Sequence, residues 1–193
     1  MGIEFELKFR ATPETLKAID TEITGDRAEF SMHTTYYDTP DGDLSARRYT
    51  LRQRMENHTA VCTLKFPAGE DGRGEFELES ADLKSALPEL CKLSGLADLP
   101  ALLEKGIVPV CGAKFHRTAI TVKLPDCTLE WALDQGILYG GGRETPLCEV
   151  EIELKDGAKE AAIAYAALMA DRFRLTGETG SKFRRALALA RGE

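Results

Sequence analysis

The chain has 193 residues, of which 43% are hydrophobic and 30% are charged, as in an ordinary folded domain. Its formal net charge of −7 argues against a nucleic-acid-binding surface, and no stretch approaches the roughly 18 apolar residues of a membrane helix. The five widely spaced cysteines contain no C-x-x-C pair, which favours reduced thiols over zinc ligands and predicts a cytoplasmic protein.

The N-terminal half is predicted to consist mainly of strands. Residues 2–10 alternate between apolar and charged side chains, which is the period of a half-buried strand. Thr12 as N-cap and Pro13 at the first helical position then predict a helix that ends near Gly25. Further strands are expected at residues 29–38, 48–56, 59–67 and 73–79, with a short helical connection around Leu44.

The C-terminal half is predicted to repeat this organisation. Residues 82–105 look helical but irregular, because Pro88 and Pro100 interrupt the pattern. Strands are then expected at residues 113–124, 127–134, 136–140 and 146–155, and helices at 158–172 and 181–191. No linker or repeat divides the chain, so we expect a single domain over residues 1–193. About eight strands with helices between them predict an α+β fold, a closed antiparallel eight-stranded β-barrel with helices packed outside.

The residues that alternate with the apolar ones form rows of charge on most of the predicted strands. In any single strand, such a row is typical of a solvated face with ion pairs. Repeated in many strands of one barrel, the rows are expected to face inward, around a space for one small ligand. The charged positions are Glu4, Glu6 and Lys8; Arg52 and Arg54; Lys65; Arg73, Glu75, Glu77 and Glu79; Arg117; Glu130 and Asp134; and Glu149, Glu151 and Glu153.

Charges inside a barrel are costly unless they are paired or bind a ligand. Lys and Arg side chains that converge from several strands neutralise phosphate oxygens, whereas clustered carboxylates hold hard cations such as Mg²⁺ or Mn²⁺. The rows of charge therefore predict an interior site for a phosphate-bearing polyanion together with a divalent metal.

In their order along the chain, these residues resemble the motifs of the CYTH family, the triphosphate tunnel metalloenzymes, over nearly the whole length. The matching segments are E-x-E-x-K at Glu4, Glu6 and Lys8; Y-Y-D-T at Tyr36, Tyr37, Asp38 and Thr39; L-R-x-R at Leu51, Arg52 and Arg54; T-x-K at Thr63 and Lys65; R-x-E-x-E at Arg73, Glu75 and Glu77; E-x-E-x-E at Glu149, Glu151 and Glu153; and S-K at Ser181 and Lys182. The segments 129–136 and 146–149 are most similar to bacterial inorganic triphosphatases.

The resemblance implies a metal-dependent triphosphatase that hydrolyses tripolyphosphate to pyrophosphate and phosphate, with Mg²⁺ or Mn²⁺ as cofactor. The implied phosphate-binding residues are Lys8, Arg52, Arg54, Lys65, Arg117 and Lys182. The implied metal ligands are Glu4, Glu6, Asp134, Glu149 and Glu151. The residues expected to be catalytic are Glu4, Glu6, Lys8, Lys65 and Arg117. We expect Glu75 and Glu77 either to pair with arginines or to act as ligands, and Arg184 and Arg185 to lie on a solvated helix face.

Other activities stay open within the same resemblance. A class IV adenylate cyclase or a thiamine triphosphatase would use the same charged interior, and a non-catalytic polyphosphate-binding module would bind without hydrolysis. The carboxylates argue against this last alternative, because a pure anion binder gains nothing from them. The expected partner is a small-molecule triphosphate or short polyphosphate, without nucleic acid or membrane, and a homodimer is left open.

Overall fold

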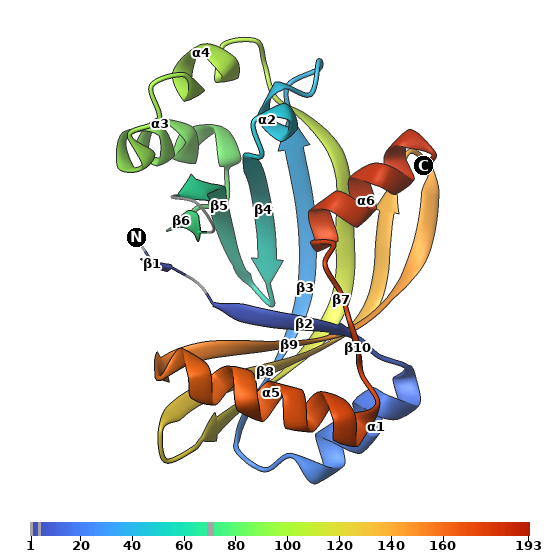
Figure 1. The fold of residues 1–193 in the computed structure, drawn as a ribbon. Helices are drawn as coiled ribbons and strands as arrows, with labels where there is room; N and C mark the ends of the chain where they lie inside the picture. Colours follow the sequence, from blue (N-terminus) through green and yellow to red (C-terminus); the bar gives the residue numbers. More distant parts are fainter. Residues whose placement is uncertain (1, 4, 69–71) are drawn as a thin grey trace.

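The computed structural model describes residues 2–3, 5–68 and 72–193, whose arrangement is shown in Figure 1. Ten strands of this described part form one antiparallel sheet in the order β1-β6-β5-β4-β3-β7-β8-β9-β2-β10. The strands are β1 (Gly2–Ile3), β2 (Glu6–Arg10), β3 (Asp26–Asp38), β4 (Thr50–Glu56), β5 (Thr59–Ala68), β6 (Gly72–Glu79), β7 (Val108–Lys123), β8 (Cys127–Gly140), β9 (Arg143–Gly157) and β10 (Thr176–Gly177). The helices are α1 (Pro13–Glu22), α2 (Asp43–Ala46), α3 (Leu83–Ser94), α4 (Leu99–Leu103), α5 (Lys159–Phe173) and α6 (Lys182–Arg191).

The two faces of the sheet differ in the way that the alternation predicts. On β8, Leu129, Trp131 and Leu133 are buried in a core cluster with residues of α1 and α5. Asp134, one position further along, must point to the opposite face because successive side chains of a strand alternate. In this part of β8 the apolar side chains therefore lie on the convex face of the curved sheet, and Asp134 lies on its concave face.

Two groups of helices cover the convex face (Figure 1). Helices α1 and α5 pack over β8 and β9, where Ile19 and Trp131 are fully buried. Helices α2, α3 and α4 pack over the other end of the sheet, where Leu64 and Leu90 are each 1% exposed. Burial of such apolar side chains contributes about 25 cal/mol per Å² of surface removed from water. Both ends of the sheet are thus held from outside, which leaves the concave face for charged side chains.

Helix α6 instead packs on the concave face. Its side chains Phe183 and Ala186 join a third core cluster with Tyr36 of β3 and Phe115 of β7. Ser181 caps the helix by accepting a hydrogen bond from the Arg184 amide at 3.1 Å. This cap places Lys182 in the first turn of the helix, directed at the charged residues of the sheet.

The prediction of a closed eight-stranded barrel is wrong. Within the described residues the sheet has ten strands and ends at β1 and β10, so its hydrogen bonding does not close into a ring. The predicted first strand, residues 2–10, is divided. Its start pairs with β6, its end pairs with β9, and the other edge of β2 is bonded to the two-residue β10. The sheet of the described residues therefore has β1 and β10 as its two ends, and the fold is α+β.

Two details of the predicted elements also differ from the structure. Residues 127–134 and 136–140 belong to one strand, β8, because Gly136 passes close to the backbone of β7. A Cβ atom at Gly136 would lie 2.1 Å from the Lys114 carbonyl oxygen, so the glycine permits close approach rather than a turn. Pro88 lies inside α3 instead of breaking it. None of the described helices combines the length and the apolar composition that a bilayer-spanning segment requires.

Candidate functional site

The charged side chains of the concave face surround a cavity of about 180 Å³. The pairing of the strands brings them together: Lys8 of β2 lies opposite Glu151 of β9, and Lys65 of β5 lies opposite Glu75 of β6. All six residues predicted to bind phosphate line this cavity, namely Lys8, Arg52, Arg54, Lys65, Arg117 and Lys182. Four strands and one helix thus direct positive charge at one small volume.

Lys8 lies between two carboxylates at one side of the cavity. Its Nζ is 2.8 Å from Glu6 Oε1 and 3.6 Å from Glu151 Oε1. Burial disfavours the ammonium charge, but the neighbouring Glu151 and Glu6 outweigh this effect and raise the pKa of Lys8. Lys8 is therefore held as a cation at the cavity wall, at neutral pH and well above it.

Arg52 and Lys65 face a second pair of carboxylates across the cavity. Lys65 Nζ lies 3.1 Å from Glu75 Oε2, and Arg52 Nη2 lies 3.5 Å from Glu75 Oε1 and 3.3 Å from Glu77 Oε1. Of the two open expectations for Glu75 and Glu77, the structure shows ion pairing with the cavity cations.

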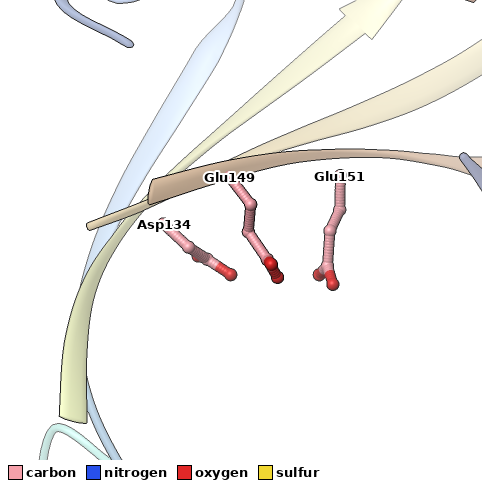
Figure 2. A group of neighbouring side chains, drawn as sticks. All are labelled: Asp134, Glu149 and Glu151. Atoms are coloured by element: carbon pink, nitrogen blue, oxygen red, sulfur yellow. The ribbon is translucent and has the colours of Figure 1, made fainter. Parts of the chain in front are cut away.

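Three carboxylates lie close together on β8 and β9, those of Asp134, Glu149 and Glu151 (Figure 2). Asp134 on β8 lies opposite Glu149 in the register with β9, and Glu151 is two positions along β9 on the same face. Each offers one oxygen within 4.8 Å of an oxygen of the others. Asp134 and Glu149 are completely buried, so only Glu151 of the three lines the cavity.

Two cations neutralise this buried acidic group. Lys182 Nζ lies 2.7 Å from Asp134 Oδ2 and 2.9 Å from Glu151 Oε1, and it also contacts the Glu149 carboxylate. Arg117 donates two hydrogen bonds of 2.7 Å to Asp134, one to each oxygen. Its Nη2 donates a further bond of 2.7 Å to Glu151. Bidentate pairing of this kind is among the strongest available to arginine.

The charges of this group depend on one another. Burial opposes the charge of Lys182, but the three carboxylates raise its pKa well above its usual range. Burial likewise opposes the charge of Glu151, but Lys182 and Arg117 hold its pKa well below its usual range. Loss of one member would consequently leave an uncompensated charge in a buried position.

Arg185 belongs to the same network, although the sequence predicted a solvated helix face for it. It contacts the buried Glu149 carboxylate, and its Nη1 lies 3.6 Å from Glu178 Oε2. Glu178 accepts a hydrogen bond of 2.6 Å from Arg10 Nε. The spacing from Lys182 to Arg185 is three residues, which places both on one face of a helix. That spacing is the signal that could have indicated Arg185, whereas Arg184 is exposed as expected.

The predicted metal ligands are only partly brought together. Asp134, Glu149 and Glu151 form the buried group, Glu6 lines the cavity beside Lys8, and Glu4 lies outside the described residues. Clustered carboxylate oxygens are the donors that hard divalent cations prefer, so the chemistry of this set fits such a metal. The Lys182 ammonium contacts all three of these carboxylates. For a metal to bind all three, this ammonium must turn away from them toward the cavity, which Lys182 also lines.

The sequence of this chain is similar to those of known proteins. The family model of the CYTH domain matches residues 2–187. An inorganic triphosphatase of Haemophilus influenzae is 31% identical over 166 residues, which cover 80% of this chain and 46% of that protein. The chain thus spans about half the length of this curated relative.

Two solved structures share the fold along almost the entire chain. A putative adenylate cyclase from Bacillus halodurans superposes with a TM-score of 0.65 at 22% identity, covering 95% of this chain and 96% of that one. A putative adenylyl cyclase from Hippeastrum with a dominant triphosphatase activity superposes with a TM-score of 0.66 at 20% identity, covering 98% and 96%. At these identities the likeness concerns the fold alone.

Proposed function

The chain belongs to the CYTH domain family, and from this premise we propose that it is a metal-dependent inorganic triphosphatase that hydrolyses tripolyphosphate to pyrophosphate and phosphate. The observation that carries the proposal is the convergence of six cationic side chains on one cavity beside three buried carboxylates. The inorganic triphosphatase among the relatives supports the choice of substrate.

The cationic side chains are proposed to bind the phosphate chain along the cavity. Lys8, Arg52, Arg54 and Lys65 would neutralise its oxygens from β2, β4 and β5. Arg guanidinium groups bind phosphate through two parallel hydrogen bonds, whereas Lys acts as a point charge. Because these cations are already paired with carboxylates such as Glu75, the substrate must compete for them, which favours a ligand of high charge density over a singly charged one.

Arg117 and Lys182 are proposed to act at the end of the chain that reacts, since they lie between the cavity and the buried carboxylates. A water oxygen would form a bond to the terminal phosphorus while the anhydride P–O bond on its far side breaks, releasing phosphate and pyrophosphate. The proton of the water would pass to a cavity carboxylate. When bound by Asp134, Glu149 and Glu151, a divalent metal would supply charge neutralisation and a lowered pKa of bound water. Positive charge placed in advance around the phosphorus would stabilise the charge that develops there.

Substrate profiling tests this proposal. Metal-stripped protein would be supplied with Mg²⁺ or Mn²⁺, and phosphate release would be measured from tripolyphosphate, ATP and thiamine triphosphate. We expect tripolyphosphate to have the highest kcat/KM and each activity to require the metal. A preference for ATP, or binding of tripolyphosphate without phosphate release under any divalent metal, would contradict the assignment.

Substitution of Lys8 tests the site itself. Lys8→Ala removes one cavity cation and is expected to lower kcat/KM for tripolyphosphate by about a hundredfold or more, in line with the loss of a single charge-stabilising donor. Lys17→Ala is the matched control, because Lys17 is an exposed lysine of α1. Circular dichroism would show that both variants keep the wild-type fold, and unchanged turnover in Lys8→Ala would refute the proposed role of this residue.

A further inference from the structure

The cavity adjoins two larger grooves with opposite charge. The first has a volume of about 750 Å³ and adjoins the cavity, with which it shares Thr50, Arg73, Ser181 and Phe183. Its other walls come from the segment around α2 and from α6. Asp41 is the one carboxylate among its described lining residues. Four arginines line the groove, namely Arg48, Arg73, Arg184 and Arg191.

Three of these arginines differ from the cations of the cavity. In the described part of the chain, Arg48, Arg184 and Arg191 take part in no ion pair, and all three side chains are exposed. Arg73 donates hydrogen bonds of 3.2 Å to the Arg48 carbonyl oxygen and to Thr50 Oγ1, which ties the groove to the cavity wall. The groove therefore carries excess positive charge, whereas the cavity cations are paired with carboxylates.

The second groove lies at the other side of the cavity and is acidic. It has a volume of about 600 Å³ and shares Arg52, Arg54, Arg117 and Glu153 with the cavity. Its carboxylates outnumber its cations, and they are Glu56, Glu75, Glu77, Glu130 and Glu153. Because the charge of this groove is slightly negative and that of the arginine groove is positive, a polyanion that is longer than the cavity is favoured on the arginine side.

We propose that the groove of Arg48, Arg73, Arg184 and Arg191 is a second phosphate-binding site, which holds the distal phosphates of linear polyphosphates longer than tripolyphosphate. This inference rests on the proposed function, because the terminal phosphates of the same chain occupy the cavity. The chain enters from the arginine side, its end reaches the buried carboxylates, and hydrolysis there leaves a shorter chain in the groove. The substrate class thus extends from tripolyphosphate to longer linear polyphosphates.

A triple variant, Arg48→Gly, Arg184→Ala and Arg191→Ala, tests the groove. Glycine is used at position 48 because Arg48 has a φ of 62°, where a new side chain would be strained. Each exposed charge contributes modestly, so we expect kcat/KM for a medium-length polyphosphate to fall about tenfold in the triple variant. Turnover of tripolyphosphate, which the proposed function places within the cavity, is expected to be unchanged. The salt dependence of polyphosphate turnover should weaken as well, because fewer charge contacts remain to be screened.

A control variant and direct binding separate the outcomes. Lys17→Ala, Lys92→Ala and Lys123→Ala together remove the same charge from exposed positions elsewhere and should leave both activities unchanged. Equal losses of kcat/KM for tripolyphosphate and polyphosphate in the triple variant, or no loss for either, would overturn the groove assignment. A loss of kcat/KM confined to ATP would also overturn it, because it would indicate a nucleotide site. If the wild type hydrolyses no triphosphate, the proposed function fails. Calorimetric titration of polyphosphate into wild-type and triple-variant protein then decides the groove by itself, because equal affinities refute it and weaker binding by the variant supports it.

Discussion

Replacement of Lys182 by methionine is the most direct perturbation of the buried charges. The Lys182 ammonium touches Asp134, Glu149 and Glu151, two of which are completely buried. Removal of one partner from a buried ion pair costs about 3–5 kcal/mol, since the charge that stays behind is desolvated and unpaired. A domain of this size is stable by only about 5–15 kcal/mol, so the expected loss is a large fraction of the whole.

Thermal unfolding measures this loss. A change of about 3–5 kcal/mol in the free energy of unfolding corresponds to a fall in Tm of roughly 6–20 °C for a chain of this length. Lys92→Met is the control, because Lys92 forms an exposed ion pair with Glu89 at 3.5 Å and its loss should leave Tm unchanged. Equal Tm values for Lys182→Met and the wild type near pH 7 would refute the inference that Lys182 compensates the buried carboxylates.

The same variant should respond to pH and to metal in a defined direction. Without Lys182, the three carboxylates repel one another, so protonation of one of them reduces this repulsion and stabilises the folded variant. The difference in unfolding free energy between variant and wild type should therefore shrink as the pH falls toward about 4, near the ordinary pKa of a carboxyl group. Addition of Mg²⁺ or Mn²⁺ should raise the Tm of Lys182→Met more than that of the wild type, because the competing ammonium is gone. An identical metal response of both proteins would contradict this competition.

Two further predictions concern the wild-type charges and the close approach in β8. Folding lowers the pKa of Glu151 and raises that of Lys182. The free energy of unfolding, measured by denaturant in a pH series, should therefore fall below about pH 4.3 and again above about pH 10.4, with a plateau between. A maximum of stability at either extreme would contradict the assigned directions. Gly136→Ala should destabilise the fold by about 1–3 kcal/mol, because the new Cβ would lie 2.1 Å from the Lys114 carbonyl oxygen. Gly177→Ala is the control and should be neutral, because no atom lies within 4 Å of its Cβ position. Equal unfolding midpoints for the two variants would show that β7 and β8 can separate locally.

The alternation of side chains was sufficient to assign the faces of the strands. Lys8, Arg54 and Lys65 were predicted to share one interior, and they line one cavity. This succeeded because the period of two along a strand is a local property, independent of how the strands are finally arranged. The resemblance to the CYTH family, which is now confirmed over residues 2–187, also came from the local order of these motifs.

The closure of the sheet could not be derived in the same way. The alternation of residues 2–10 is uninterrupted, yet the start and the end of this segment pair with β6 and β9, at different places in the sheet. Similarly, residues 127–134 and 136–140 are predicted as two strands, although they form the single strand β8, in which Gly136 permits the close approach of β7. Strand pairing depends on contacts between residues far apart in the chain, which no local period records.

By itself, the sequence determined which side chains are charged, which face of each strand they occupy, and which family their order resembles. Only the tertiary structure decided how those charges are combined. Helix α6 crosses the concave face and brings Lys182 and Arg185 to Glu149, which lies more than thirty residues earlier in the chain. Whether a carboxylate binds a metal or pairs with a neighbouring lysine or arginine depends on distance and burial. These are set by the packing of α6 on the sheet and not by any spacing along the chain.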